Sequence, residues 1–435
     1  KRTCYRARRK RLWMALVMNV SDYKTEFNKR IKPNIYTDKI FGLKKKAFEK
    51  FLVSGLPTNK WENWKHSNLY KINSLKTPSF NSIKKTPIGL NNIKIPINNL
   101  IDLVFYNGVY RKDLSSKLPK GVSISENLDS ILDNNDFYDS TPFGLLNTVF
   151  LNSGIKINID PNLALDKVLR IIYNSSGSES GIIYPRVVVK INKSASCSII
   201  EHHINNLKSS FQNGVTRISI DNNARLNHIK IQKNSQTMID MSSITVKQNK
   251  ESYYNYMQYC DGSDIGRNNI HIIMEGDGSN CYLGGISLTK NGQQIDNNIL
   301  VEHKGKHTTS SQIFKAILDD NSSGVFDGKV IIREKAIKTD AAQSNRNLIL
   351  SNNAGVNSNP QMEIYNDDVK CSHGSSTGEL DREALFYMRS RGLSLFSAKS
   401  LLIRGFISDL INDINHDELK KYLFAEFDKW LVENN

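Results

Sequence analysis

Short runs in which apolar and polar residues alternate, separated by small polar turns, recur through the middle of the chain. Alternation with a period of two predicts β-strands. The recurring runs begin at about residue 187 and read VVVKINKSASCSIIEHH, TRISIDNNARLNHIKIQ, SSITVKQNKESYYNYMQY, IHIIMEGDGSNCYLGGISL, ILVEHKGKHTTSSQIFKAIL and KVIIREKAIKTDAAQSNRNLIL. The apolar residues that precede the turns are Ile191, Ile220, Val246, Met274, Val301 and Ile332, which gives steps of 29, 26, 28, 27 and 31 residues. A near-constant step predicts stacked repeats, each burying its apolar face against its neighbours.

Two architectures satisfy this repeat. In a parallel β-solenoid each unit forms one turn of a coil and contributes to inward-facing ladders of apolar side chains, whereas in an antiparallel meander each polar turn closes a hairpin. The turns DNNA, KQNK, GDGS and HKGK suit either arrangement. The even period favours the solenoid, because the loops of meanders usually vary in length. The fold class expected is therefore mainly β.

The period becomes helical on the N-terminal side of the repeats. Apolar residues at helical spacing in residues 40–53 predict an amphipathic helix, which ends where Gly55 caps it and Pro57 prevents its continuation. We interpret the lysines at 44–46 in this helix as a solvated face rather than a phosphate-binding patch. Residues 75–100 are rich in Lys, Asn, Ser, Thr and Pro and predict a long connection.

A helical period also follows the repeats. DREALFYMRSRG predicts a short helix capped by Gly392, apolar residues every four positions from 398 to 414 predict a second helix, and residues 419–430 predict a third. This unit is too small for a large core of its own, so we expect it to dock on the end of the solenoid or on a partner. The expected organisation is a leader at residues 1–17, an N-terminal helical region and linker at 18–100, a solenoid core at 101–378 and a C-terminal helical region at 379–435.

The charge of the chain is concentrated at its beginning. A formal charge of +16 raises nucleic acid or an anionic membrane as a partner, but seven basic residues lie in residues 1–11, and without them the balance is 52 − 43 = +9. The apolar stretch at 12–17 is too short to cross a bilayer, and no small-residue cleavage site follows it. We interpret residues 1–17 as a leader outside the fold, non-native or ahead of a start at Met14 or Met18. No apolar run approaches the ~18 residues of a membrane span, so no membrane partner is expected.

The cysteines favour a reducing compartment. Their number is odd, and they form no CxxC or similar pair, so neither a disulfide framework nor a local zinc site is encoded. We therefore expect a cytoplasmic protein. The five positions are Cys4, Cys197, Cys260, Cys281 and Cys371.

The common catalytic motifs are absent from the sequence. There is no GxxxxGK[ST], GxGxxG, HExxH or GxSxG, so we expect no nucleotide bound by this chain. The glycine-rich EGDGSN and DGSDIG are interpreted as solenoid turns, because no helix follows them. His202 and His203 are adjacent and point to opposite faces of a strand, so they cannot hold one metal ion together. His303 and His307 flank a turn and could converge, although surface positions in that turn are favoured.

One short cluster has a spacing suited to metal binding. In DDVKCSHG, Cys371 and His373 lie two positions apart, so an extended strand places both side chains on one face, within reach of one soft or borderline metal ion. Two ligands are half of a site, and the remainder must come from elsewhere in the fold or from another chain. By spacing alone, a buried structural cysteine beside an unrelated histidine is the stronger interpretation.

Residues 284–411 resemble the SufB/SufD family of iron–sulfur cluster assembly scaffolds. The similar segments are GGISLTKNGQQIDNNILVEHKGKHTTSSQIFKAILDD, GVFDGKVIIREKAIKTDAAQSNRNLILS and NPQMEIYNDDVKCSHGSSTGELDREALFYMRSRG. Within the family, DDVKCSHG followed by G-x-L-x-x-x-x-LFY resembles the SufD branch. GLPTNKWENWKHSNLYKI near the N-terminus is also similar to that branch, while residues 75–180 match only loosely.

The resemblance implies a right-handed parallel β-helix between helical regions, and a non-catalytic scaffold subunit. It implies pairing with a SufB-like subunit through the β-helix, and binding of a SufC-like ABC ATPase through the C-terminal helices, around residues 381–414. A nascent iron–sulfur cluster is then expected at the interface with SufB, with His373 as the metal-contacting residue of this chain and Cys371 close enough to assist. A homodimer is expected when the chain is isolated.

Two alternative functions stay open at this point. A carbohydrate-active β-solenoid enzyme, a lyase or hydrolase, would need acids and a base on one face of the solenoid. A basic nucleic-acid-binding protein would retain DNA in a salt-dependent way after deletion of residues 1–17.

Overall fold

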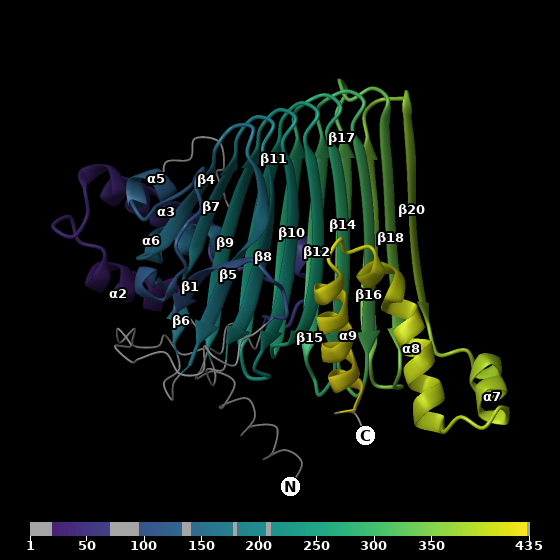
Figure 1. Ribbon diagram of the computed structural model, residues 1–435. Coiled ribbons are helices and arrows are strands. Elements are labelled where there is room, and N and C mark those ends of the chain that lie inside the picture. Colours follow the sequence, from purple (N-terminus) through teal and green to yellow (C-terminus); the bar gives the residue numbers. More distant parts are fainter. Residues whose placement is uncertain (1–19, 70–94, 133–140, 177–180, 206–209, 433–435) are drawn as a thin grey trace, which may run out of the picture.

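The computed structural model describes residues 20–69, 95–132, 141–176, 181–205 and 210–432, and it confirms a parallel β-solenoid (Figure 1). From residue 186 onward, successive strands alternate between two ten-stranded sheets, so each turn of the coil adds one strand to each sheet. Along the solenoid the neighbours within a sheet run parallel: residue 225 lies opposite residue 253, and residue 280 opposite residue 309. The antiparallel meander is therefore excluded for the repeats. The predicted leader at 1–17 lies outside the described residues.

We name the two sheets A and B. Sheet A contains, in spatial order, β2 (Val109–Tyr110), β1 (Leu100–Tyr106), β5 (Ala164–Ser175), β8 (Ser196–Asn205), β10 (Arg225–Asn234), β12 (Tyr253–Gly262), β14 (Asn280–Thr289), β16 (Thr309–Leu318), β18 (Thr339–Ile349) and β20 (Val369–Gly378). Sheet B contains β19 (Gly355–Ile364), β17 (Ser323–Ile332), β15 (Gln294–His303), β13 (Ile265–Met274), β11 (Ile239–Gln248), β9 (Phe211–Ile220), β7 (Arg186–Ile191), β4 (Gly154–Ile159) and β3 (Val122–Ser125), with β6 (Ile182–Ile183) beside β9.

The six apolar residues chosen as one ladder belong to two neighbouring ladders. Val246 and Val301 lie two residues earlier in the register than the other four. The positions that continue the ladder of the other four on these strands are occupied by Gln248 and His303, both of which are buried inside the solenoid. Because these two residues are polar, the apolar pattern in the sequence ends two residues early on β11 and β15. The observed ladder is Ile191, Ile220, Gln248, Met274, His303 and Ile332.

The interior of the solenoid is apolar along one side and polar along the other. The apolar side is one continuous cluster dominated by isoleucine, valine and leucine. The polar side is bridged by hydrogen bonds between the sheets, because buried polar groups need partners. Two examples are Nζ of Lys230 donating to Oδ1 of Asn268 at 2.6 Å, and Nε2 of Gln258 donating to Oδ1 of Asn297 at 2.7 Å.

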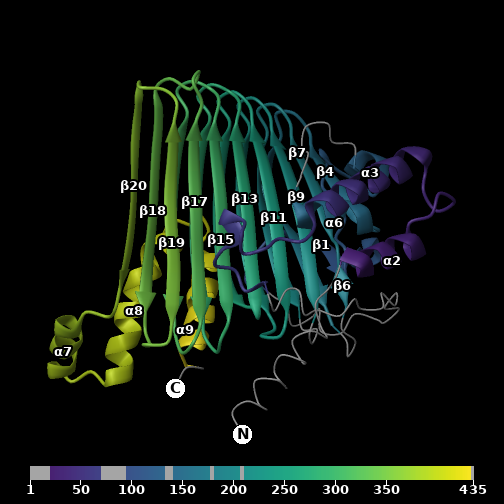
Figure 2. The same ribbon diagram turned by 180° about the vertical axis from the view of Figure 1, so that it is seen from behind.

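The N-terminal helices cover the first turns of the solenoid (Figure 2). The predicted helix at 40–53 is confirmed as α3, with Gly55 in a left-handed conformation at its end (φ 69°). An aromatic and aliphatic cluster joins α3 to β6, β9, β11 and β13 of sheet B. The helical elements here are α2 (Val20–Arg30), α3 (Asp38–Ser54), α5 (Leu128–Leu132) and α6 (Pro142–Phe150), with short 3-10 turns η1 (Glu62–Trp64) and η3 (Lys112–Leu114).

The interpretation of residues 44–46 as a solvated face is wrong for Lys44 and correct for Lys45 and Lys46, which are exposed. Lys44 is fully buried, and its Nζ donates to the carbonyl oxygens of Val149 at 2.8 Å and Leu151 at 2.6 Å. These carbonyls lie at the C-terminal end of α6, where a helix leaves its last carbonyl groups without internal partners. Lys44 therefore caps a neighbouring helix.

A short segment after α3 crosses the outer face of sheet B. The guanidinium of Arg267 on β13 lies 3.8 Å from the ring centre of Trp64, and Oγ of Ser67 donates to Oδ2 of Asp296 on β15 at 2.5 Å. The main chain at His66 accepts a hydrogen bond from Gln294. These contacts attach the N-terminal region to the middle of the solenoid.

The C-terminal helices are α7 (Arg382–Ser390), α8 (Leu395–Asn412) and α9 (Asp417–Val432), at the predicted positions. Helices α8 and α9 dock on the outer face of sheet A rather than on the end of the solenoid (Figure 1). Helix α7 projects beyond the sheet, and none of its residues is buried. Among the described residues, no helix combines the length and apolarity needed to cross a membrane.

Candidate functional site

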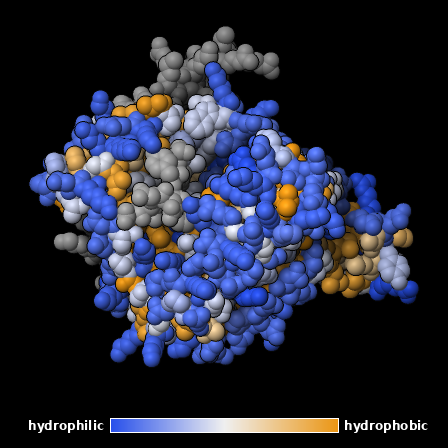
Figure 3. Space-filling model, turned by 90° about the horizontal axis from the view of Figure 1, so that it is seen from above, coloured by the Kyte–Doolittle hydropathy of each residue, from blue (hydrophilic) through white to orange (hydrophobic). Residues whose placement is uncertain are grey.

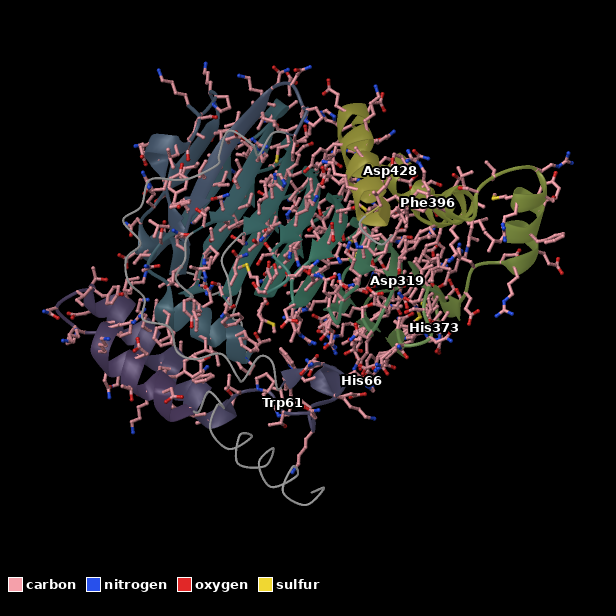
Figure 4. The ribbon with its side chains drawn as sticks, turned by 90° about the horizontal axis from the view of Figure 1, so that it is seen from below. Trp61, His66, Asp319, His373, Phe396 and Asp428 are labelled. Carbon is pink, nitrogen blue, oxygen red and sulfur yellow. The ribbon has the colours of Figure 1, made fainter. Side chains whose placement is uncertain are left out.

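Cys371 and His373 lie on β20, the last strand of sheet A. The register places Cys371 beside Ala341 and His373 beside Gln343 of β18. Because side chains alternate along a strand, both point to the inner side of sheet A, as the spacing predicted. Within the described part of the chain β20 has a strand neighbour on one side only. Figure 4 shows His373 at the end of the solenoid opposite the N-terminal helices.

The two side chains differ in environment. His373 is exposed, whereas Cys371 is partly buried and packs against the apolar core of the solenoid. Burial, and then the carboxylate of Asp340, raise the pKa of the Cys371 thiol. The thiol is therefore protonated near neutral pH, and metal binding there would release a proton.

A network of hydrogen-bonded polar side chains lies inside this open end of the solenoid. Oγ of Ser358 lies 2.7 Å from Oγ of Ser375 and donates to Oδ1 of Asn345 at 2.7 Å. Nδ2 of Asn347 donates to the same Asn345 oxygen at 2.7 Å, and to Oγ1 of Thr377 at 3.3 Å. These contacts join β18, β19 and β20, so the last turn is held in place without a further turn above it.

The described residues supply only part of a metal site. They contain no group of three His, Cys, Asp or Glu side chains placed to hold one ion. Thiolate and imidazole are suitable ligands for iron. Cys371 and His373 are therefore two candidate ligands at an open end, where a second chain could add others.

The other cysteines that the structure describes lie too far from Cys371 to share a metal ion with it. Cys197 and Cys281 belong to the same inward ladder as Cys371, a relationship the sequence analysis did not detect. Cys281 is three strands from Cys371, or about 14 Å at the spacing of neighbouring strands. Burial raises the pKa of the thiols of Cys197, Cys260 and Cys281. Cys4 lies outside the described residues.

The histidine pairs behave differently from each other. His202 and His203 point to opposite faces, as predicted: the ring of His203 stacks on Tyr173 inside, and that of His202 faces Tyr422 of α9 outside. The preference for a surface role is wrong for His303, which is buried, and correct for His307, which is exposed. The two therefore do not form a site together.

A buried acid–histidine cluster lies inside the first turns and was missed by sequence reasoning. Oε1 of Glu201 is 3.2 Å from Nε2 of His228, and its other oxygen is 3.5 Å from Nε2 of His203. Burial by itself raises the pKa of Glu201, but hydrogen bonds from the two imidazoles outweigh it, so the pKa is lowered. The sequence shows only that Glu201 and His203 lie two positions apart. It does not show that His228 joins them, because His228 comes from the next turn of the solenoid.

The C-terminal helices carry the largest exposed apolar side chains near the open end. We call Phe386, Tyr387, Leu393, Leu395, Phe396 and Leu401 the α7–α8 patch; Phe386 is 76% exposed. Figure 3 shows apolar residues gathered on the projection at the right. Apolar patches of this kind mark interaction surfaces.

Comparison with known proteins identifies the family. A family model described as "SUF system FeS cluster assembly, SufBD core domain" matches residues 172–406, more than half of the chain. The chain is 27% identical over 392 residues to the iron–sulfur cluster assembly protein SufD of Escherichia coli, covering 87% of this chain and 90% of that protein.

Two further relatives agree with this match. An iron–sulfur cluster assembly SufBD family protein of Synechocystis is 25% identical over 385 residues, covering 82% of this chain and 84% of that protein. The chloroplastic protein ABCI7 of Arabidopsis thaliana is 32% identical over 241 residues, covering 54% and 50%. The chain therefore belongs to the SufBD family and has a role in iron–sulfur cluster assembly by the SUF system.

Proposed function

We propose that this chain is a SufD-like, non-catalytic scaffold subunit that pairs with a SufB-like subunit and contributes His373, assisted by Cys371, to the nascent iron–sulfur cluster. The observation that carries the proposal is the position of these two side chains on one face of the last strand, at the open end of the solenoid. The cluster is cargo under assembly, and the SufB-like subunit supplies the remaining ligands.

The end strands β19 and β20 support the pairing. Strand edges present main-chain N–H and C=O groups that pair readily with another chain. Next to the β19 edge, Ile364 is 46% exposed and Tyr365 54% exposed, which adds apolar area. The same edges would let two copies form a homodimer when the SufB-like partner is absent.

The α7–α8 patch supports the binding of a SufC-like ATPase. Helix α7 projects away from sheet A, so both the helix and the exposed side chains beside it are accessible to a second protein (Figure 1). Hydrolysis of ATP belongs to that partner in our proposal, because the sequence contains none of the common nucleotide-binding motifs. The cysteine usage favours the cytoplasm or another reducing compartment. Neither nucleic acid nor a membrane is a partner in this scheme, and the family membership argues against the carbohydrate-active alternative.

Replacement of His373 tests the proposal. The His373→Ala chain is co-expressed with SufB-like and SufC-like partners, the complex is purified without oxygen, and the cluster is measured by its visible absorption. We expect the complex to assemble normally and the cluster yield to fall at least tenfold. Ser372→Ala, on the opposite face of the same strand, is the matched control. An unchanged yield in the His373→Ala complex would falsify the assignment of His373.

A further inference from the structure

Gln343 of β18 lies directly beside His373 of β20 in the parallel register. Both side chains point to the inner side of sheet A, and neighbouring strands are separated by about 4.8 Å. His373 is exposed at the open end, whereas Gln343, one strand deeper, is only 3% exposed. The carboxamide of Gln343 therefore lies behind the imidazole.

A hydrogen bond to the preceding strand of sheet A sets the orientation of the Gln343 carboxamide. Nε2 of Gln343 donates to Oε1 of Gln312, its neighbour on β16, at 3.2 Å. The nitrogen and oxygen of a carboxamide diverge from the carbon that joins them. With the nitrogen directed toward β16, the oxygen is directed away from β16, and β20 is the strand on that side of β18.

Gly328 on β17 of the opposite sheet makes room for this arrangement. A Cβ atom at this position would lie 2.1 Å from Nε2 of Gln343, which is far too close. The same Cβ atom would lie 2.7 Å from the ring of Phe326, so another residue at position 328 would displace both the ring and the carboxamide. The two close approaches together explain the glycine.

The carbonyl oxygen of Gln343 is left without a partner. Oε1 is buried and accepts no hydrogen bond from any described residue. A buried acceptor without a donor is costly, so this oxygen calls for an explanation. The nearby Asn345 shows the contrast, because its oxygen accepts from Ser358 and Asn347 while its nitrogen donates to the main chain of Phe314.

We propose that Gln343 is a positioning residue for His373: its Oε1 accepts a hydrogen bond from one ring N–H and so leaves the other ring nitrogen free to bind iron. This inference rests on the proposed function of His373. Histidines that bind metals usually donate their other ring N–H to an oxygen of the protein, which fixes the tautomer and the orientation of the ring. The side-chain oxygen of Gln343 is the buried acceptor that β18 places next to this histidine.

The first test measures the tautomer of the His373 imidazole. The full chain, labelled with ¹⁵N-histidine, is examined by NMR at about pH 8.5, where an ordinary imidazole is neutral, with the His373 signal assigned from His373→Ala. We expect one dominant tautomer in the wild type. Gln343→Met, of similar length but without an acceptor, should give a mixture, and Gln343→Glu should restore one tautomer. Gly328→Ala should act like Gln343→Met by displacing the carboxamide.

The second test uses the assembled complex and Fe²⁺ as the probe. Gln343→Met should lower Fe²⁺ affinity and cluster yield 10- to 100-fold, the usual effect of losing such a partner, and Gln343→Glu should recover most of it. Gln361→Met is the matched control: it makes the same chemical change in the last turn, on the outer face of sheet B beside Lys329 rather than beside His373, and should change neither readout more than twofold.

The outcomes separate this inference from the proposed function. The same tautomer mixture in wild type and Gln343→Met would overturn the positioning role, whatever happens to the cluster. A tautomer shift together with an unchanged cluster yield in His373→Ala would uphold the hydrogen bond and overturn the role of His373 in assembly. A loss in Gln361→Met equal to that in Gln343→Met would reduce the effect to general damage of the solenoid end and so overturn the inference.

Discussion

Nζ of Lys315 on β16 donates to both carboxylate oxygens of Asp409 on α8, at 2.6 and 2.7 Å, and to the carbonyl oxygen of Phe406 at 2.7 Å. The lysine side chain is 4% exposed, so these oxygens replace water around its ammonium group. A buried charge that loses its partner is more costly than an exposed one. This pair therefore attaches the C-terminal helices to sheet A.

Removal of the carboxylate should loosen that attachment. We expect Asp409→Ala to lower the free energy of unfolding by about 1–3 kcal/mol, because it leaves a buried ammonium with only a main-chain partner. Urea denaturation followed by circular dichroism measures the change. Asp428→Ala is the control, since Asp428 forms an ion pair with Arg404 that is exposed on both sides, and such pairs contribute below about 1 kcal/mol. Equal losses in the two variants would contradict the prediction.

A charge placed in the α7–α8 patch should block the ATPase without unfolding the chain. In Phe386→Asp, we expect the affinity for the SufC-like partner to fall at least tenfold, because apolar residues at the centre of an interface contribute most of its energy. The melting temperature should stay unchanged, since Phe386 is exposed. Val53→Asp, on the exposed face of α3, supplies the same chemical change far from the patch. Calorimetry measures the affinity of the two variants for the SufC-like partner. An affinity of Phe386→Asp equal to that of the wild type would show that the partner binds to a different surface.

The stability of the chain should fall as the pH drops from about 6.5 toward 4. Burial lowers the pKa of His303 to about 4, while an unfolded histidine titrates near 6.5, so the unfolded chain binds more protons in this window. The loss from His303 reaches about 3 kcal/mol at the acid end. The pKa of His202 is also lowered by burial, so it adds to the loss in the same direction.

His303→Gln should reduce this pH dependence, because a glutamine retains a donor and an acceptor for Thr308 and Ser310 but does not titrate. Urea unfolding at pH 5 and pH 7.5 measures the difference. His307→Gln, at an exposed histidine, is the control and should leave the pH dependence of stability unchanged. If the unfolding free energy changed with pH equally in wild type and His303→Gln, the buried neutral imidazole would not be a cause of the pH dependence.

Lys44→Ala should be far more damaging than Lys45→Ala. The first change leaves main-chain carbonyls at the end of α6 without a donor and opens a cavity, so we expect a loss of about 2–4 kcal/mol in unfolding free energy. The second removes an exposed side chain and should cost less than about 0.5 kcal/mol. Thermal unfolding of the two variants side by side gives the comparison. Similar losses would mean that the buried position of Lys44 is incorrect.

The fold was predictable because its signals are local. Strand alternation, the repeat of 26 to 31 residues and the helix ends at Gly55 and Gly392 can all be read within short windows. The shared face of Cys371 and His373 is equally local, since it follows from the period of a strand. Each of these signals depends only on residues close together in the chain.

The interior was predictable only where it is apolar. Gln248, His303 and Lys44 are polar residues that the packing buries. Their hydrogen-bond partners are the main chain of Asn280, the hydroxyls of Thr308 and Ser310, and the main chain at the end of α6, in that order. Pattern alone places such residues on the surface, because burial of a polar group is favourable only when its partner is present. The sequence does not show which groups become these partners, even for His303, whose partners lie only a few residues away.

By itself, then, the sequence determined the repeat, the strands and helices, and the paired thiol and imidazole on one side of the last strand. The tertiary structure decided which side chains from different turns meet: Gln343 beside His373, His228 beside Glu201, and the C-terminal helices on sheet A rather than on its end. The physical reason is register. Each turn of the coil has its own length, so the residue that stacks beside another one turn away is set by the hydrogen bonding between strands and not by a fixed spacing in the chain.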